Sequence, residues 1–145
     1  MTEDLPDPLA AIHAAAFTHE RPWSAKELAA LMASPHVFAC ALPNSSAPRA
    51  FALGRVVAGE AELLTLACDP AHQGQGFGRA ALQAFEAEAR LRAADQAFLE
   101  VADDNTPARS LYMRAGYNET GRRKAYYRRK GRADADACLM VKQLA

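Results

Sequence analysis

The sequence predicts a mixed α/β fold in which helices and a sheet pack in layers. Short apolar runs bounded by turn residues, typical of strands, alternate with segments whose apolar residues recur at helical spacing. In the middle of the chain an apolar run leads through a glycine-rich turn directly into a helical pattern. In order the elements are ααβββαβαββ, which we assign to one domain spanning residues 1–145.

Two helices are predicted near the start of the chain. Asp7 and Pro8 suit the first helix as cap and first helical residue, because the N–H that proline lacks has no partner there. The apolar face of this helix consists of Leu9, Ile12, Ala16 and Phe17. Ser24 and Glu27 have the spacing of a capping box and predict the start of the second helix. Residues 1–5 are too few and too polar for a good opening strand.

The remaining elements follow from apolar runs and chain breakers. Three strands are expected over 37–42, 50–57 and 60–68, and the central helix follows the glycine turn. Next come a short strand over 97–101 and a helix that begins near Asn105 and ends at Gly116. Two closing strands over 117–122 and 137–144 flank a basic loop that carries two tyrosines.

Composition excludes several classes of protein. Lysine and arginine balance aspartate and glutamate at zero net charge, which argues against a general nucleic-acid binder and against disorder. Cys40, Cys68 and Cys138 are odd in number and lack a C-x-x-C pair, so we expect reduced thiols and no metal site. With no signal peptide and no membrane-length apolar segment in the sequence, we expect a cytoplasmic protein without a membrane partner.

The glycine-rich turn suits a phosphate group. Gly74, Gly76 and Gly78 allow the backbone to approach a ligand closely, and the first N–H groups of the following helix have no partners within the helix. The helix dipole and Arg79 add positive potential, so a pyrophosphate is the expected ligand. A turn that merely changes the chain direction is the alternative.

Two well-known phosphate loops do not fit this turn. In a dinucleotide fingerprint the third glycine would fall at Arg79, and a Walker loop needs a Gly-Lys-Ser/Thr run that is absent. The string Gln73-Gly-Gln-Gly-Phe-Gly78 instead resembles the Gln/Arg-x-x-Gly-x-Gly/Ala loop with which the GNAT superfamily of N-acetyltransferases binds coenzyme A.

The resemblance extends from about Pro22 to the C-terminus and is greatest to the RimI-like branch, whose members acetylate the N-terminal alanine of a ribosomal protein. The matching segments are Arg21-Pro22-Trp23-Ser24, Ala61 to Pro70, the glycine turn, Leu99-Glu100-Val101, Asn105, Leu111-Tyr112, Ala115-Gly116-Tyr117 and Arg122 to Tyr127. The resemblance implies the GNAT fold, a mixed and mostly antiparallel sheet flanked by about four helices, here with its usual first strand reduced or absent.

By this resemblance Glu100 is the general base and Tyr112 the general acid. A carboxylate can take the amine proton, and a phenol can protonate the thiolate that leaves. The alternatives are an outward-facing strand residue for Glu100, since it alternates with Leu99 and Val101, and a packed aromatic for Tyr112.

The resemblance also implies the residues that bind acetyl-CoA. The backbone of Leu66, Ala67 and Cys68 would contact the acetyl and pantetheine groups, with the Cys68 N–H as the donor to the thioester carbonyl. Asn105 would hydrogen-bond the cofactor, unless it is only a helix cap. The pyrophosphate would bind to Gln73, Gly74, Gln75, Gly76, Phe77, Gly78 and Arg79. In a different mechanism Cys68 would be a nucleophile with His72 as its base.

The acceptor would contact Trp23, Tyr126 and Tyr127, again by resemblance. The basic loop over 122–132 either is a solvated face or attracts an acidic or ribosome-associated partner. His13, His19 and His36 lack the spacing of ligands, and we interpret them as surface or satisfied core residues.

Together these features predict an acetyl-CoA-dependent N-acetyltransferase that acts on a protein N-terminal α-amine by direct transfer in a ternary complex. The alternatives are an acetyltransferase for lysine or for a small amine, and a non-catalytic coenzyme-A-binding module. We expect no metal and no direct nucleic-acid partner, and a monomer or weak dimer.

Overall fold

An open sheet of six strands organises the described part of the molecule, which the computed structural model gives for residues 5–17, 23–127 and 133–145. The elements are α1 (Pro6–Ala16), α2 (Ala25–Met32), β1 (Val37–Leu42), β2 (Ala50–Val57), β3 (Glu60–Cys68), the short 3-10 helix η2 (Pro70–His72), α3 (Phe77–Leu91), β4 (Gln96–Ala102), α4 (Thr106–Arg114), β5 (Asn118–Tyr127) and β6 (Ala135–Gln143). This order confirms the predicted ααβββαβαββ pattern, with η2 as an addition.

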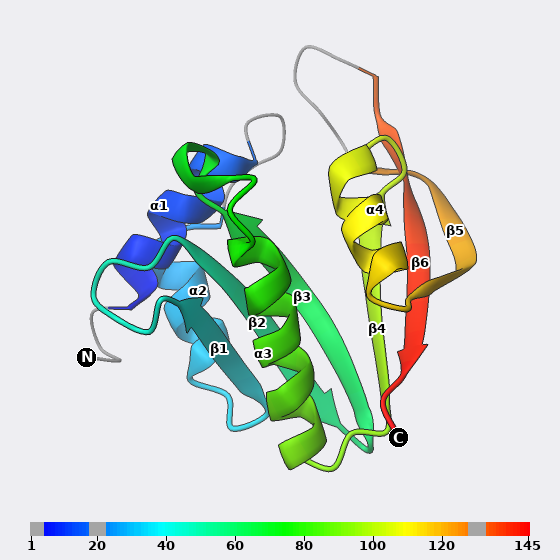
Figure 1. Cartoon of the computed structure of the whole chain (residues 1–145), viewed down its shortest axis with the longest axis horizontal. Helices are drawn as coiled ribbons and strands as arrows, with labels where there is room; N and C mark the ends of the chain where they lie inside the picture. Colours follow the sequence, from blue (N-terminus) through cyan, green and yellow to red (C-terminus); the bar gives the residue numbers. More distant parts are fainter. Residues whose placement is uncertain (1–4, 18–22, 128–132) are drawn as a thin grey trace.

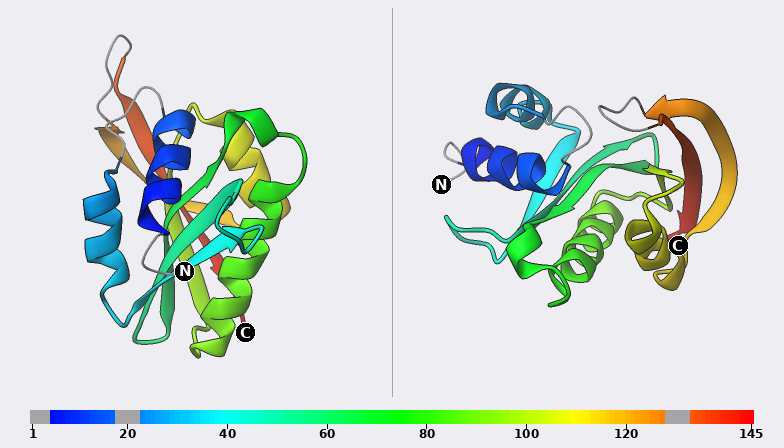
Figure 2. Two further views of the ribbon diagram at one scale, coloured as in Figure 1. Left: turned by 90° about the vertical axis from the view of Figure 1, so that its left-hand side faces the viewer. Right: turned by 90° about the horizontal axis from the view of Figure 1, so that it is seen from above.

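The strands lie in the order β1-β2-β3-β4-β6-β5. All neighbouring pairs are antiparallel except β3 and β4, which run parallel. The expected mixed, mostly antiparallel sheet is therefore confirmed. Helices α1 and α2 cover one face of the sheet, and α3 and α4 cover the other (Figures 1 and 2).

A hydrophobic cluster lies on each face of the sheet. On the α3 side Phe85 packs over β2 at Gly54, where an added Cβ would lie 2.7 Å from the Phe85 ring and 2.6 Å from the Phe38 ring. Only glycine leaves room for both rings, so Gly54 sets how closely α3 approaches the sheet. On the opposite face Leu9 of α1 and Leu28 of α2 are fully buried against the sheet.

An extra residue in β3 bends that strand in the middle of the sheet. Leu53 of β2 is paired with Thr65 and Gly54 with Leu63, so that Leu64 is left over as a β-bulge. A bulge bends its strand and shifts which side chains point to which face. Accordingly Leu63 belongs to the core under α3, whereas Leu64 packs with the cluster under α1 and α2.

The parallel pairing of β3 with β4 is short. It begins at Glu60 opposite Gln96 and ends at Leu63 opposite Leu99, one residue before the bulge. Both strands continue, β3 to Cys68 and β4 to Ala102, and they diverge as they do so (Figure 1). Backbone groups of both strands beyond this point are therefore without a strand partner on that side.

Three expected boundaries were wrong. The first helix begins at Pro6 with Leu5 as a cap that makes no side-chain hydrogen bond, and Asp7 lies in the first turn, where its charge favours the helix dipole. Strand β5 continues to Tyr127, because β6 begins earlier than expected and pairs Ala135 with Tyr127. Arg123 and both tyrosines therefore lie on a strand, not in a loop.

The remaining local predictions have simple outcomes. The capping box is present, since the Glu27 N–H donates to Ser24 Oγ and the Ser24 N–H donates to Glu27 Oε1, both at 3.1 Å. Gly116 ends α4 with a φ of +102°, which favours glycine. Residues 1–4, His19 and the part of the basic loop over 128–132 lie outside the described residues. Among the described helices none is both long and apolar enough to span a bilayer.

Candidate active site

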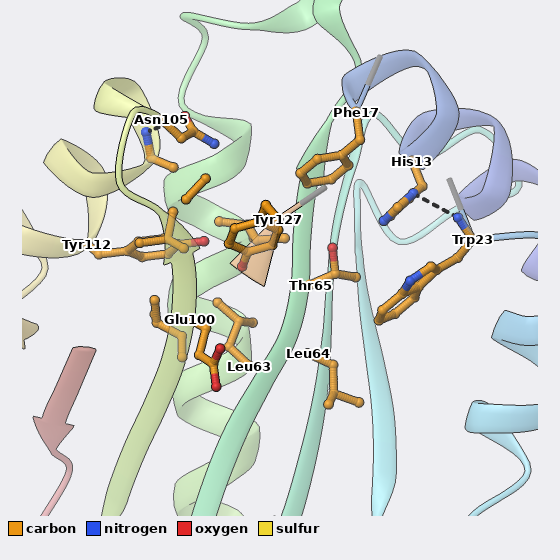
Figure 3. Close-up of a pocket in the computed structure, with 15 residues that line it drawn as sticks. His13, Phe17, Trp23, Leu63, Leu64, Thr65, Glu100, Asn105, Tyr112 and Tyr127 are labelled. Atoms are coloured by element: carbon orange, nitrogen blue, oxygen red, sulfur yellow. Dashed lines mark hydrogen bonds between the residues drawn. The ribbon is translucent and has the colours of Figure 1, made fainter. Parts of the chain in front are cut away.

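The two diverging strands enclose a cavity of about 270 Å³, here called the inner cavity (Figure 3). Its walls come from β3, β4 and α4, from the end of β5, and from the α1 and α2 region. The residues used below are His13, Trp23, Thr65, Glu100, Tyr112 and Tyr127. The bulge and the short β3–β4 pairing therefore open a pocket in the middle of the sheet, with apolar walls and a few polar groups.

Glu100 lies on β4 directly after the last paired residue, and its side chain lines the inner cavity. Its Oε1 lies 3.1 Å from Nη2 of Arg123 on β5. Its Oε2 is buried and has no hydrogen-bond partner in the described structure. A buried carboxylate oxygen without a hydrogen bond is unfavourable unless a ligand donates one to it. Glu100 is therefore the strongest candidate for a base in this cavity.

Tyr112 lies on α4 across the cavity from β3 and is buried. Its ring packs edge-on against Tyr117 at 5.9 Å, and its hydroxyl points into the cavity beside Tyr127 (Figure 3). Burial, and secondarily Tyr127, raises the pKa of Tyr112 above its usual value of about 10. The phenol therefore keeps its proton at neutral pH. The Tyr112 ring also packs in the core, as expected from the alternative interpretation of Tyr112 as a packed aromatic residue.

A second depression of about 1,130 Å³, here called the helix groove, runs between α3 and α4. It shares Phe17, Leu66, Asn105, Ala108 and Tyr112 with the inner cavity. Because the two spaces have these walls in common, a long ligand in the helix groove can present one end to a second molecule in the inner cavity. Tyr112 lies where the two spaces meet.

The glycine-rich turn forms one end of the helix groove. Gly74 and Gly76 have φ values of +80° and +86°, and a Cβ at either position would meet nothing within 4 Å. The first α3 hydrogen bond here runs from Ala80 N to Gly76 O at 3.0 Å, so the N–H groups of residues 77–79 are the partnerless ones at the helix start. Open glycine backbone and free N–H groups together fit a phosphate.

Six of the seven residues predicted for the phosphate line the helix groove: Gln73, Gly74, Gly76, Phe77, Gly78 and Arg79. Gln75 is exposed and does not line it. Gln75 lies between two glycines with positive φ, Gly74 and Gly76.

The end of β3 presents backbone groups to the space between the strands. Asp69 N donates to Arg49 O on the β2 side at 2.8 Å. Since successive residues of a strand direct their N–H groups to opposite sides, Cys68 and Leu66 point theirs toward β4, beyond the end of the β3–β4 pairing. By the same alternation Ala67 directs its N–H to β2, so it can contribute only the wall of the groove.

Asn105 caps α4, as one of its two interpretations predicted. Its Oδ1 accepts a hydrogen bond from Ala108 N at 3.3 Å. Its side chain also lines both the inner cavity and the helix groove, so the amide nitrogen is available to a ligand.

The geometry disfavours Cys68 as a nucleophile. Burial raises the pKa of its thiol, and the neighbouring Asp69 raises it further. The Sγ donates to Asp69 O at 3.6 Å, and the His72 ring packs edge-on against Phe77 at 6.2 Å. A nucleophilic cysteine needs a lowered pKa, so the Cys68 thiol is better explained as part of the groove wall.

Of the residues predicted to contact the acceptor, Trp23 and Tyr127 line the inner cavity and Tyr126 does not. Tyr126 is 50% exposed, its ring lies 5.2 Å from that of Tyr127, and the Arg123 guanidinium lies 5.2 Å above it. Tyr126 therefore supports its neighbours instead of facing the cavity.

His13, which the sequence predicted to be a surface or satisfied core residue, lines the inner cavity. It is 5% exposed and accepts a hydrogen bond from Trp23 N at Nδ1. Burial lowers its pKa to about 4, against a smaller opposing effect of Glu27. The only sequence signal was a histidine next to Ile12 on the apolar face of an amphipathic helix. His36, in contrast, is exposed as expected.

The chain matches a known protein family over most of its length. Residues 6–117 match the family model described as the acetyltransferase (GNAT) family. The chain belongs to this family. It is an N-acetyltransferase by fold and by relationship, and the predicted family and fold are thereby confirmed.

Individual GNAT relatives are similar over almost the whole chain. The [ribosomal protein bS18]-alanine N-acetyltransferase of Escherichia coli is 38% identical over 92% of this chain and 88% of its own. The crystal structure of the E. coli ribosomal-protein-S18-alanine N-acetyltransferase has a TM-score of 0.87, with 34% identity over 100% of this chain and 90% of its own. N-alpha-acetyltransferase RimI of Mycobacterium tuberculosis is 35% identical over 90% of this chain and 82% of its own.

A more distant GNAT structure shares the fold. Arabidopsis thaliana NAA60, solved in complex with acetyl-CoA, has a TM-score of 0.80 and 18% identity, covering 95% of this chain and 92% of its own. At this identity the likeness speaks for the fold alone.

Proposed function

We propose that this GNAT enzyme transfers an acetyl group from acetyl-CoA to the N-terminal α-amine of a protein, by direct transfer in a ternary complex. One observation carries the proposal. Glu100, with one oxygen unpartnered, and the protonated Tyr112 both face the inner cavity, and Tyr112 also borders the helix groove. A base and an acid at the junction of two binding spaces are what direct transfer from a thioester to an amine needs.

Acetyl-CoA fits the helix groove by its chemistry. The open backbone of Gly74 and Gly76 and the free N–H groups at the start of α3 suit its pyrophosphate, with Arg79 adding a positive charge. The N–H groups of Leu66 and Cys68 are available to its amide and thioester oxygens, and Asn105 offers an amide nitrogen. When bound, acetyl-CoA supplies an activated acetyl group as a thioester.

The chain's own groups then have distinct tasks. Glu100 Oε2 accepts a proton from the acceptor amine, directly or through a water, while Arg123 holds Oε1 in place. The Cys68 N–H stabilises negative charge on the carbonyl oxygen. Tyr112 holds a proton at its hydroxyl for the thiolate that leaves.

An α-amine is a better acceptor for this site than a lysine side chain. An α-amine has a pKa near 8, so an appreciable fraction is neutral at physiological pH, whereas lysine at about 10.4 is almost entirely charged. The Arg123 guanidinium beside Glu100 also disfavours a polycationic amine close to the base. The inner cavity is small and bounded by apolar side chains such as Trp23 and Leu64, which favours a small first residue.

The names of the relatives specify this acceptor further. The E. coli relative is named for the alanine of ribosomal protein bS18, and the chain covers most of that relative's length. We therefore propose the N-terminal alanine of a ribosomal protein as the acceptor, and the cytoplasm, where ribosomal proteins are made, as the location.

The test is thiol release from acetyl-CoA against a panel of short peptides. The panel contains a peptide that begins with alanine, the same peptide with a blocked N-terminus and an internal lysine, and a polyamine. Mass spectrometry of the products locates the acetyl group. We expect transfer to the free alanine α-amine. Transfer only to lysine or to the polyamine would replace the proposal with those activities, and binding of acetyl-CoA without thiol release for any amine would indicate a non-catalytic module.

A further inference from the structure

His13 is held in one orientation by two neighbours. The Trp23 backbone N–H donates to His13 Nδ1 at 3.2 Å. The imidazole stacks on the Trp23 indole with ring centroids 5.3 Å apart and an interplanar angle of 13°, and the Phe17 ring lies 4.5 Å away. An imidazole packed between two aromatic rings and hydrogen-bonded at one nitrogen has little freedom to rotate.

The same hydrogen bond determines which nitrogen carries the proton. Nδ1 accepts, so it presents its lone pair to Trp23, and a neutral imidazole must then carry its single proton on Nε2. Burial keeps His13 neutral by lowering its pKa to about 4. His13 therefore offers a hydrogen-bond donor of fixed direction at neutral pH.

That donor lies on the cavity side of the ring. His13 lines the inner cavity, and its second nitrogen lies on the side of the ring that faces Thr65 and Phe17, away from Trp23 (Figure 3). No described residue accepts a hydrogen bond from Nε2. Thr65, 9% exposed, also lines this cavity. Nε2 is not one of the buried atoms that lack a partner in the described structure, so its significance lies in its direction: an N–H donor that faces a binding cavity can be completed by an acceptor on the ligand.

A peptide carbonyl is the acceptor group that a neutral N–H recognises best here. The cavity already holds a carboxylate for the amine at Glu100, and the peptide carbonyls that follow an α-amine lie one and two residues further along the acceptor chain. A small-molecule amine has no such carbonyl at a fixed distance from its amine. His13 would therefore distinguish a peptide N-terminus from an isolated amine.

We propose that His13 binds the acceptor peptide by donating a hydrogen bond from Nε2–H to the carbonyl oxygen of its first or second residue. The inference rests on the proposed function, because it names how the acceptor of that reaction is held. His13 is thus an acceptor-binding residue on the side of the inner cavity away from Tyr112, and neither the base nor the acid.

The test combines an enzyme variant with acceptor analogues. The variant His13→Phe keeps an aromatic ring against Trp23 and removes the donor, and His13→Gln retains an acceptor and a donor on one side chain. The analogues are the alanine peptide with an uncharged (E)-alkene in place of its first or its second peptide bond. Comparing both enzymes on each analogue cancels changes in amine basicity.

With the normal peptide we expect His13→Phe to lose about tenfold in kcat/KM for the acceptor, mostly through KM, which is the usual effect of one neutral hydrogen bond. The KM for acetyl-CoA should stay within about twofold, because His13 does not line the helix groove. On one of the two analogues the kcat/KM of the wild type should fall about tenfold, whereas that of His13→Phe should not fall further. With the normal peptide, His13→Gln should recover most of the kcat/KM that His13→Phe loses.

Equal sensitivity of the wild type and His13→Phe to both analogues would overturn the assignment of His13 while leaving the proposed function intact. Failure of the wild type to acetylate any peptide α-amine would overturn the proposed function and this inference with it. If His13→Phe does not fold, a measurement on the wild-type protein tests the same proposal. In imidazole ¹⁵N spectra, the Nε2 signal of His13 should be protonated and should shift when the alanine peptide is added, and an unmoved signal would contradict the proposal.

Discussion

Glu100 and Arg123 form an ion pair that occupies only half of the carboxylate. Nη2 of Arg123 lies 3.1 Å from Oε1 of Glu100, and Oε2 is buried and without a partner among the described residues. The arginine comes from β5 and the glutamate from β4, with β6 between them in the sheet. The pair therefore holds the carboxylate in one orientation and leaves one oxygen for a ligand.

Replacing Glu100 by glutamine removes the negative charge with almost no change in shape. We expect kcat to fall by roughly 10² to 10⁴, the usual contribution of a general base, with the Kd for acetyl-CoA almost unchanged. Steady-state thiol release and calorimetric binding measure the two quantities. Glu62→Gln is the matched control, because Glu62 is ion-paired with Arg55 and lines neither cavity. Normal turnover in Glu100→Gln would show that another group takes the proton.

Arg123→Met tests whether the orientation of Glu100 matters. The Arg123 side chain is 55% exposed, so losing the ion pair should change the free energy of unfolding by less than about 1 kcal/mol. The freed carboxylate can adopt other rotamers, and we expect kcat to fall about tenfold. Arg122→Met is the control, since Arg122 pairs with Asp103, Glu119 and Asp136 and not with Glu100. Equal losses of kcat in both variants would mean that the basic strand acts through its general charge.

Tyr112→Phe removes one hydroxyl from a buried ring. Because the pKa of Tyr112 is raised, the wild-type phenol stays protonated across the working pH range, and its loss should lower kcat about a hundredfold. The packing of the ring is kept, so thermal unfolding should hardly change. Tyr117→Phe is the same chemical change on the neighbouring ring, which lines neither cavity, and its kcat should stay within about twofold. A normal kcat for Tyr112→Phe would assign the proton donor to water.

Gly76→Ala separates backbone strain from ligand contact. Alanine at a φ of +86° should destabilise the fold by about 1–2 kcal/mol. Gly76 lines the groove and an added Cβ would meet no protein atom within 4 Å, so the methyl would occupy space next to the proposed pyrophosphate, and the KM for acetyl-CoA should rise about tenfold. Gly59→Ala carries similar strain at a φ of +81° in the β2–β3 turn, at the opposite end of β3 from the groove residues Leu66 and Cys68, and should leave this KM unchanged. A rise in KM for both variants would trace the effect to stability.

The element order and the glycine turn were predictable because they depend on local sequence. No tertiary information is needed to recognise the helical spacing of apolar residues in α3, the capping box formed by Ser24 and Glu27, or the end of α4 at Gly116. Glu100 was noticeable for the same reason, as a charge between two apolar strand residues.

The inner cavity was not predictable, because it depends on strand pairing. Leu64 is an ordinary apolar residue in the sequence and becomes a bulge only through its register with β2. His13 lies 52 residues before Thr65 in the chain and lines the same cavity only after α1 has packed on the sheet. The length of β5 likewise depends on its partner β6.

The buried neutral imidazole of His13 makes stability depend on pH. Burial lowers its folded-state pKa to about 4, against about 6.5 in the unfolded chain. Between these values the unfolded chain binds more protons, so the His13 contribution is fully present above about pH 6.5 and is lost as the pH falls toward 4. From pH 7 to pH 5 this one group should lower the free energy of unfolding by about 2 kcal/mol.

Urea unfolding at both pH values measures this decrease. In His13→Gln the decrease should be smaller by about that amount, while the exposed control His36→Gln should follow the wild type. Parallel pH curves for His13→Gln and the wild type would mean that His13 takes up its proton at the same pH in the folded and unfolded chains, which would contradict a buried imidazole that stays neutral at pH 5.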